Sequence, residues 1–178
     1  MQTQKLGYVD NIEIVHKNKE GKILSEKIIN NGWLHRLLCK LGLRHNSMTA
    51  TGFAGIAGLI GNVGSISPFT VIGIGTNNTS ATVNDTALLG SVKLSSATVS
   101  RVTTTYTNDT LQLVHTFSAA NDNLTGTNAI VEIGCFNGLT NGTDIMCLRQ
   151  VYSPADSCNW DNGDTLQVTV KIKCMQGT

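Results

Sequence analysis

Charged residues are scarce in this chain of 178 residues, where they make up only 14% of the total. The formal net charge is +1, which gives no global attraction to the phosphates of a nucleic acid. Aromatic residues contribute 5%, and they do not alternate with basic residues as a base-stacking surface requires. We therefore expect no nucleic-acid partner.

Patterns typical of metal sites and membrane spans are also missing. No two cysteines have the Cys-x-x-Cys spacing of a zinc site (Cys39, Cys135, Cys147, Cys158 and Cys174). No apolar run reaches the length of a membrane span, and the N-terminus lacks the apolar segment of a signal peptide. We expect reduced, mostly buried thiols, no metal, no cofactor and no membrane partner.

Groups that can carry catalysis are dispersed. His115 shares a predicted strand face with apolar residues, which favours a packed histidine over a Cys–His dyad with Cys135 or Cys147. Three aspartates near the C-terminal end suggest either a hard-cation site or a solvated turn (Asp156, Asp161 and Asp164). Their spacing fits no EF-hand loop, which favours the turn. We predict that the protein is not an enzyme.

The few charges are distributed unevenly. Residues 1–45 hold eight Lys and Arg against four Asp and Glu, whereas residues 46–178 hold five against eight. The basic end is either a solvated surface or an arm that docks on an acidic neighbour. In the second region, Thr, Ser, Asn and Gly fill the polar positions. That composition suits β structure, and it also gives a surface that desolvates at low cost, as interface cores do.

Alternation of apolar and polar residues predicts a mainly β protein. It is clearest over residues 165–174, where every second residue is apolar (Leu166, Val168, Val170, Ile172 and Cys174). Hairpins are expected from 11–16 with 22–29, from 101–106 with 111–117 and from 127–136 with 145–152, and a further apolar strand from 69–75. The fold class that follows is an antiparallel β-sandwich, jelly-roll-like, with an N-terminal β-hairpin and one short α-helix.

The short helix is expected over residues 33–41. Its apolar residues recur at helical spacing, and Asn31 is a candidate cap (Trp33, Leu34, Leu37, Leu38 and Leu41). A single helical turn is expected after Asn84 or Asp85. We predict one domain over residues 1–178: a basic hairpin and helix over 1–45, a Gly-rich insert over 46–65 and a β-sandwich over 66–178.

Glycine falls at every third position of residues 52–64. A buried Gly-rich loop or irregular helix is one interpretation, and a flexible apolar loop that orders only in an assembly is the other, because glycine makes a segment costly to order alone. On the second interpretation, the apolar side chains of this segment bind a partner (Phe53, Ile56, Leu59 and Ile60).

The hairpin of 127–136 with 145–152 also predicts an ion pair. Matching the apolar faces places Cys135 opposite Met146 and Ile133 opposite Leu148, so that Glu132 lies opposite Arg149. Glu132 and Arg149 are then a structural cross-strand ion pair. A register slipped by one residue would instead bring Cys135 beside Cys147 and Glu132 toward Gln150.

Four stretches, in this order, resemble a widespread family of tailed-bacteriophage virion proteins of β-sandwich type. They are residues 27–38, residues 71–76 with 84–88, residues 131–137 and residues 163–170. Asn77 replaces a glycine that is usual in the family, and the Gly-rich insert at 52–64 has no counterpart there. The resemblance implies a virion structural role and no catalytic residues.

We therefore expect a non-enzymatic bacteriophage virion structural protein, assembled in the bacterial host cytoplasm. The favoured role is a capsid decoration or minor head protein that acts as a homo-oligomer, with a trimer as one form, and contacts the major capsid protein. The alternatives are a tail, collar or fibre-base component of the same fold, or a carbohydrate-binding fibre module in which Trp160 lies beside Asp161 and Asn162.

Overall fold

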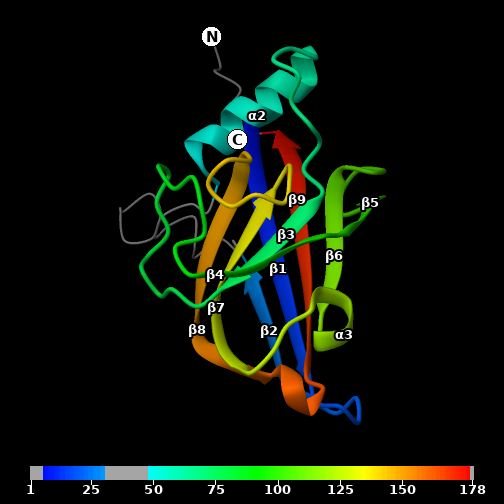
Figure 1. Ribbon diagram of the computed structural model, residues 1–178. Coiled ribbons are helices and arrows are strands. Elements are labelled where there is room, and N and C mark those ends of the chain that lie inside the picture. Colours follow the sequence, from blue (N-terminus) through cyan, green and yellow to red (C-terminus); the bar gives the residue numbers. More distant parts are fainter. Residues whose placement is uncertain (1–5, 31–47, 177–178) are drawn as a thin grey trace.

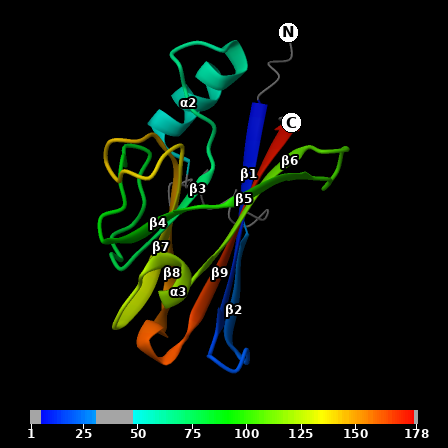
Figure 2. The ribbon, with the colours of Figure 1, turned by 45° about the vertical axis from the view of Figure 1, so that its right-hand side comes forward.

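Strands with alternating apolar residues form two antiparallel sheets that pack face to face, and Figure 2 separates the two layers. The structure, a computed structural model, describes residues 6–30 and 48–176. The predicted antiparallel β-sandwich with an N-terminal strand pair is confirmed. The predicted helix over 33–41, with its cap Asn31, lies outside the described residues.

The first sheet has five strands in the order β2-β1-β9-β6-β5. These are β1 (Leu6–Lys17), β2 (Ile23–Asn30), β5 (Thr98–Val102), β6 (Thr110–Phe117) and β9 (Thr165–Gln176). Strand β1 pairs with β9 along its whole length, from Leu6 opposite Gln176 to Lys17 opposite Thr165. The N-terminal hairpin is therefore part of the sandwich, which residues 66–178 do not complete on their own.

The second sheet has four strands in the order β4-β3-β7-β8. These are β3 (Val71–Gly75), β4 (Ser91–Ser96), β7 (Thr127–Phe136) and β8 (Met146–Asn159). The main core lies between the sheets, where the alternation predicted over 165–174 buries Leu166, Val168, Val170 and Ile172. A smaller apolar cluster forms separately from this core (Val71, Leu88, Phe136 and Met146).

The structure describes one helix of several turns, α2 (Ala50–Gly61), which lies at one end of the sandwich (Figure 1). The others are the single turn α3 (Ala119–Asp122) and the 3-10 turn η1 (Trp160–Asn162). The helical turn expected after Asn84 or Asp85 is absent from the loop of residues 76–90. There the Asp85 carboxylate accepts hydrogen bonds from the backbone and side chain of Thr82, so it closes a local turn instead.

The hairpin of β5 and β6 forms, but its first strand ends earlier than predicted, at Val102. Residues 103–109 form the connecting loop. The Asp109 carboxylate accepts from the backbone N–H groups of Thr104, Thr105 and Tyr106, which therefore do not take part in the sheet.

The Gly-rich insert forms a regular helix, α2, and not the loop or irregular helix that its glycines suggest. Thr49 caps α2 by accepting from the Gly52 N–H at 2.9 Å. Gly52, Gly55 and Gly58 form its buried face. A Cβ atom on Gly52 would stand 2.2 Å from the carbonyl oxygen of Cys147 in β8, so glycine is what allows the helix backbone to approach the sheet this closely.

The hairpin of β7 and β8 forms as expected, but its predicted register is wrong by two residues. Arg149 lies opposite Gly134, and Glu132 lies opposite Val151. The alternative register, slipped by one residue, is not adopted either, because Gln150 lies opposite Ile133. A shift of two keeps Glu132 and Arg149 on the same face of the sheet as diagonal neighbours.

A bulge, which the face-matching argument did not contain, accounts for one of the two residues. The other arises at the turn, where Phe136 lies opposite Met146 and not opposite Ile145. Cys135 lies opposite Leu148, whereas its neighbour Phe136 lies opposite Met146, so β8 has one extra residue at this point. Met146 therefore belongs to the small cluster with Phe136, and Leu148 takes its expected place in the main core.

Candidate functional site

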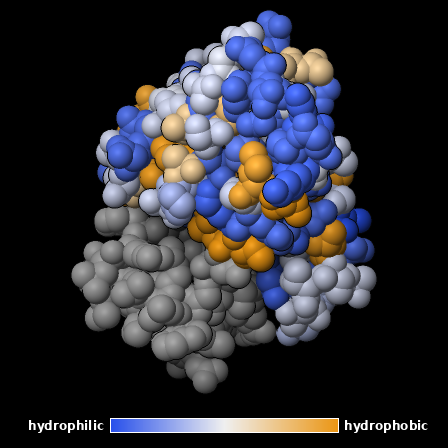
Figure 3. Space-filling view, turned by 90° about the horizontal axis from the view of Figure 1, so that it is seen from below, coloured by the Kyte–Doolittle hydropathy of each residue, from blue (hydrophilic) through white to orange (hydrophobic). Residues whose placement is uncertain are grey.

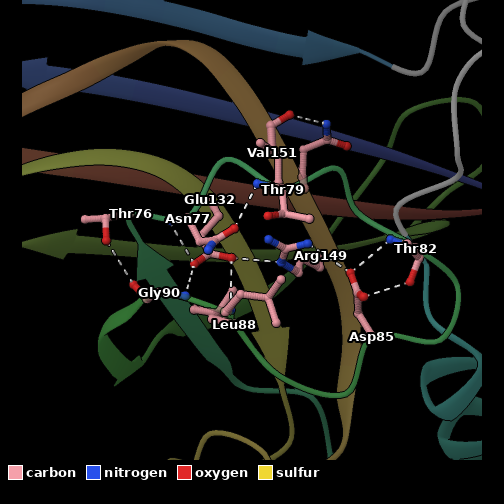
Figure 4. A network of polar contacts seen from close by, with 12 residues as sticks. Thr76, Asn77, Thr79, Thr82, Asp85, Leu88, Gly90, Glu132, Arg149 and Val151 are labelled. Carbon is pink, nitrogen blue, oxygen red and sulfur yellow. Dashed lines mark hydrogen bonds and ion pairs between the residues drawn. The ribbon is translucent and has the colours of Figure 1, made fainter.

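An ion network is buried in the second sheet, beneath the loop of residues 76–90 (Figure 4). Arg149 Nε in β8 donates to Glu132 Oε2 in β7 at 2.8 Å, and both side chains are completely buried. Arg149 Nη1 donates to Asp85 Oδ2 in the loop at 3.0 Å. A single buried cation is thus shared by two carboxylates from segments far apart in the sequence.

The Glu132 carboxylate also holds the loop through its backbone. It accepts from the N–H groups of Gly90 at 2.6 Å, Asn77 at 3.3 Å and Leu89 at 3.3 Å. Strand β3 leaves space for it, because a Cβ atom on the opposing Gly75 would stand 2.4 Å from Glu132 Oε1. The carboxylate is fully engaged by donors, so we interpret it as a clamp and not as a catalytic acid.

Asp85 is ionised more readily than a free aspartate. Burial opposes its charge, but hydrogen bonds from the Thr82 backbone and side chain and the charge of Arg149 outweigh this effect and lower the pKa of the carboxyl. Arg149 Nη2 has no hydrogen-bond partner among the described residues.

The clamped loop also supports the start of α2. The Ala50 N–H, in the first turn of the helix, donates to the carbonyl oxygen of Val83 at 2.7 Å. A second loop, residues 137–145, is joined to the first by the Asn141 side chain, which donates to Leu88 O at 2.9 Å and accepts from Leu88 N at 2.8 Å. The network therefore holds in place the two loops next to the first turn of α2.

The face of α2 turned away from the sandwich is apolar. Ile60 is 76% exposed, and Phe53 and Leu59 are also exposed, whereas Ile56 is half-buried and packs against the core. Of the four residues expected to bind a partner, three thus reach the surface and Ile56 belongs mainly to the base of the helix. No Asp, Glu, Lys or Arg occurs in residues 46–84, so the surface of α2 carries no charged side chain.

A second buried polar cluster connects the two sheets. Lys27 Nζ in β2 is 2.7 Å from Asp156 Oδ1 in β8, and the Ser25 hydroxyl donates to the same oxygen. His16 in β1 lies between two carboxylates, with Nε2 at 3.2 Å from Asp164 Oδ2 and Nδ1 at 3.9 Å from Asp156 Oδ1. We call these five residues the inter-sheet polar cluster.

The solvated turn expected for the three aspartates is therefore wrong for two of them. Asp156 and Asp164 are buried, and only Asp161 is exposed. Their charges affect the surrounding groups. Burial, and then the charges of Asp156 and Asp164, raise the pKa of the Cys158 thiol to about 12. Burial and the Asp156 carboxylate also raise the pKa of Tyr152.

His115 has partners other than a thiol. Its Nε2 is 3.0 Å from Asp122 Oδ1, its ring packs edge-on against Phe117, and Asp122 also accepts from the Ser95 hydroxyl. Contact with the Cys147 thiol and burial raise the pKa of Cys135 well above its ordinary value, which opposes formation of a reactive thiolate. Within the described part of the chain, no group of His, Cys, Asp and Glu has the geometry of a metal site.

Trp160 is buried, and its Nε1–H donates to the Asn128 side chain at 2.8 Å. It is therefore not the exposed aromatic platform on which the carbohydrate-binding alternative depended. No helix formed by residues 6–30 or 48–176 is long and apolar enough to cross a membrane.

Comparisons with protein-family models, with curated proteins and with solved structures gave no match.

Proposed function

We propose that this chain is a non-enzymatic structural protein of a tailed-bacteriophage virion, and that it decorates the head or serves there as a minor protein. The observation that carries the assembly role is the apolar outer face of α2. A helix that is apolar all round is normally buried, because water-facing helices carry polar residues on their outer side. In α2 every residue except Thr51 is apolar or glycine, and Ile60 is 76% exposed.

The construction beneath this helix supports the same proposal. Burying Arg149 and Glu132 is costly unless their geometry is held, and here both are used to fix the loop on which the helix begins. A rigid, uncharged, apolar projection suits a permanent contact with a neighbouring subunit. The four stretches that resemble the phage family support a virion as the assembly. The major capsid protein and further copies of this chain are then the proposed neighbours.

The experiment that tests the role is a virion map combined with variants of α2. Ile60→Lys places a charge on the outer face of the helix and should prevent incorporation into virions while the isolated protein remains folded. Val99→Lys is the matched control, because Val99 is 42% exposed on β5 and belongs neither to α2 nor to residues 1–45. Equal incorporation of the Ile60→Lys and wild-type proteins would overturn the proposed docking face.

The map separates head from tail. Density for this chain on the capsid lattice supports the head role, and density on a tail tube, collar or fibre base supports the alternative location. Absence of the chain from purified virions would overturn the virion role itself.

A further inference from the structure

The inter-sheet polar cluster brings a lysine and an aspartate together where water has little access. The Lys27 side chain is 17% exposed, the Asp156 side chain is 1% exposed, and Nζ lies 2.7 Å from Oδ1. Tyr152 covers the amine, with Nζ 5.2 Å from the centre of its ring. The two residues come from edge strands of different sheets. Lys27 lies in β2, at one edge of the first sheet, and Asp156 lies in β8, at one edge of the second.

The local backbone fixes both side chains. Lys27 lies opposite the buried Ile14, and Asp156 opposite the buried Ile130, so both point between the sheets. The β8 backbone bulges just before Asp156. Glu132 of β7 pairs with Val151, whereas Ile130, only two residues earlier in β7, pairs with Asp156. Reacting groups held at contact distance in a fixed orientation react far faster than the same groups free in solution.

From this geometry we propose that Lys27 and Asp156 condense to an intramolecular amide, which links the two sheets covalently. The ammonium first gives a proton to the carboxylate. The lone pair of the neutral amine then attacks Cγ of Asp156 and forms the Nζ–Cγ bond. A carboxyl oxygen leaves with two protons as water, so the sum is one ammonium and one carboxylate converted to one amide and one water. Nothing is oxidised or reduced.

The neighbouring residues match the requirements of each step. Lys27 Nζ lies 2.7 Å from Oδ1, so this oxygen takes the first proton and leaves as water. The Ser25 hydroxyl donates to the same oxygen and assists its departure. Asp156 Oδ2, which is buried without a hydrogen-bond partner among the described residues, stays on Cγ and becomes the oxygen of the amide. His16 Nε2 is held by Asp164 at 3.2 Å, which turns Nδ1 toward Asp156 as a carrier of the transferred proton.

The product is detected by mass. The full chain, denatured after purification and incubation, should be lighter than its sequence by the mass of one water, and digestion should give a branched peptide joining the segments that contain Lys27 and Asp156. An unchanged mass, with Lys27 in an ordinary linear peptide, overturns the proposal. This readout needs no variant and is independent of where the protein acts.

Two controls show whether the buried site causes the reaction. Lys27→Arg keeps the cation but has no nucleophilic amine, and it should keep its full mass. Lys171 Nζ lies at the same distance, 2.7 Å, from Glu13 Oε1, but those side chains are 25% and 34% exposed. This pair should stay ionic, and an amide at Lys171 would contradict the role of the enclosed site.

The positioning residues are tested by rate. Ser25→Ala removes the donor to the leaving oxygen and should slow amide formation by about 100-fold or more, while the final loss of one water stays the same. His16→Gln should also slow amide formation, and the effect should be greatest under conditions in which proton transfer is the rate-limiting step. Formation at the wild-type rate in both variants would contradict the proposed assistance.

Discussion

Arg149 carries a full charge at a site with no exposure to solvent, and its stability depends on the two carboxylates that face it. Arg149→Met removes the charge and leaves Glu132 buried and unpaired. We expect this variant to lose about 3–5 kcal/mol of unfolding free energy, measured by urea denaturation. Lys171→Met, in the half-exposed pair with Glu13, should cost only about 0–1 kcal/mol.

The double variant Glu132→Gln with Arg149→Met separates two explanations of that loss. If the penalty arises from an uncompensated buried charge, the double variant is more stable than Arg149→Met alone. If both variants lose the same amount, the packing of the arginine side chain, and not its charge, accounts for the effect.

Asp85 makes the stability of the loop depend on pH. Its pKa is lowered in the folded protein, so its contribution is fully present above its ordinary value of 3.8 and is lost as the pH falls toward the folded value. Asp85→Asn should therefore be less stable than the wild type at neutral pH, and this difference should shrink below about pH 4. Urea unfolding at several pH values measures it.

The control is Asp161→Asn, because Asp161 is exposed and in no ion pair that the structure describes. It should change the unfolding free energy by less than about 0.5 kcal/mol. A difference between wild type and Asp85→Asn that grows toward low pH would contradict the assigned role of Asp85.

At the scale of residues, the sequence predicts on which face of a sheet a side chain lies, because side chains alternate between the two faces along a strand. Glu132 and Arg149 were placed on one face because opposed strands share side-chain direction, and that argument survives an error of two residues in the register. It does not extend to Asp85, which reaches Arg149 from a loop. Nor does it find the pairing of Lys27 with Asp156, which are distant in sequence and meet only when two sheets pack.

At the scale of elements, α2 is a helix whose glycine pattern does not predict its regular structure. Glycine disfavours a helix by local propensity, so the sequence suggested a loop or an irregular helix over residues 52–64. The structure forms a regular helix because the glycines lie on one face and permit close contact with Cys147, Phe69 and Ile66. Tertiary packing, which local propensity does not include, decides the outcome.

Two glycines of α2 should respond in opposite directions to the same substitution. Gly52→Ala places a methyl group into the Cys147 backbone and should cost about 1–3 kcal/mol, because the helix must move off the sheet. In Gly61→Ala the new Cβ meets only the Val63 side chain at 3.4 Å, so helix propensity should stabilise the protein by up to about 1 kcal/mol.

Thermal and urea unfolding of the two variants measure the effect, and each serves as the control for the other. Stabilisation by both substitutions would mean that α2 does not rest on β8 through its glycine face. Loss of stability in both would mean that the outer end of the helix is also closely packed.

At the scale of the whole molecule, alternation predicted the sandwich and its hairpins, because these depend on contacts between neighbouring segments. The pairing of β1 with β9 was not predicted. It joins opposite ends of the chain, and no local pattern specifies which strands meet at such a distance. Local patterns therefore predict a basic hairpin beside the sandwich, whereas the strands of this hairpin complete one of the two sheets.

The two ends of the sandwich differ in a way that separates the two modes of docking expected from the sequence. One end carries the uncharged face of α2, whereas the described part of the opposite end is mostly hydrophilic with several separate apolar areas (Figure 3). Docking through α2 buries apolar area and involves no charged side chain of residues 46–84. Docking through the basic residues of 1–45 would instead depend on charge attraction, which salt screens.

If the proposed virion role holds, we expect the protein to remain bound to virions when the salt concentration is raised to roughly 1 M, where the screening length falls to about 3 Å. Sedimentation of virions at low and high salt, followed by quantification of this chain in the pellet, measures retention. Ile60→Lys should reduce retention at both concentrations, and Val99→Lys should reduce it at neither. Release of the wild type by salt alone would assign docking to the basic region, because apolar contacts are not weakened by screening.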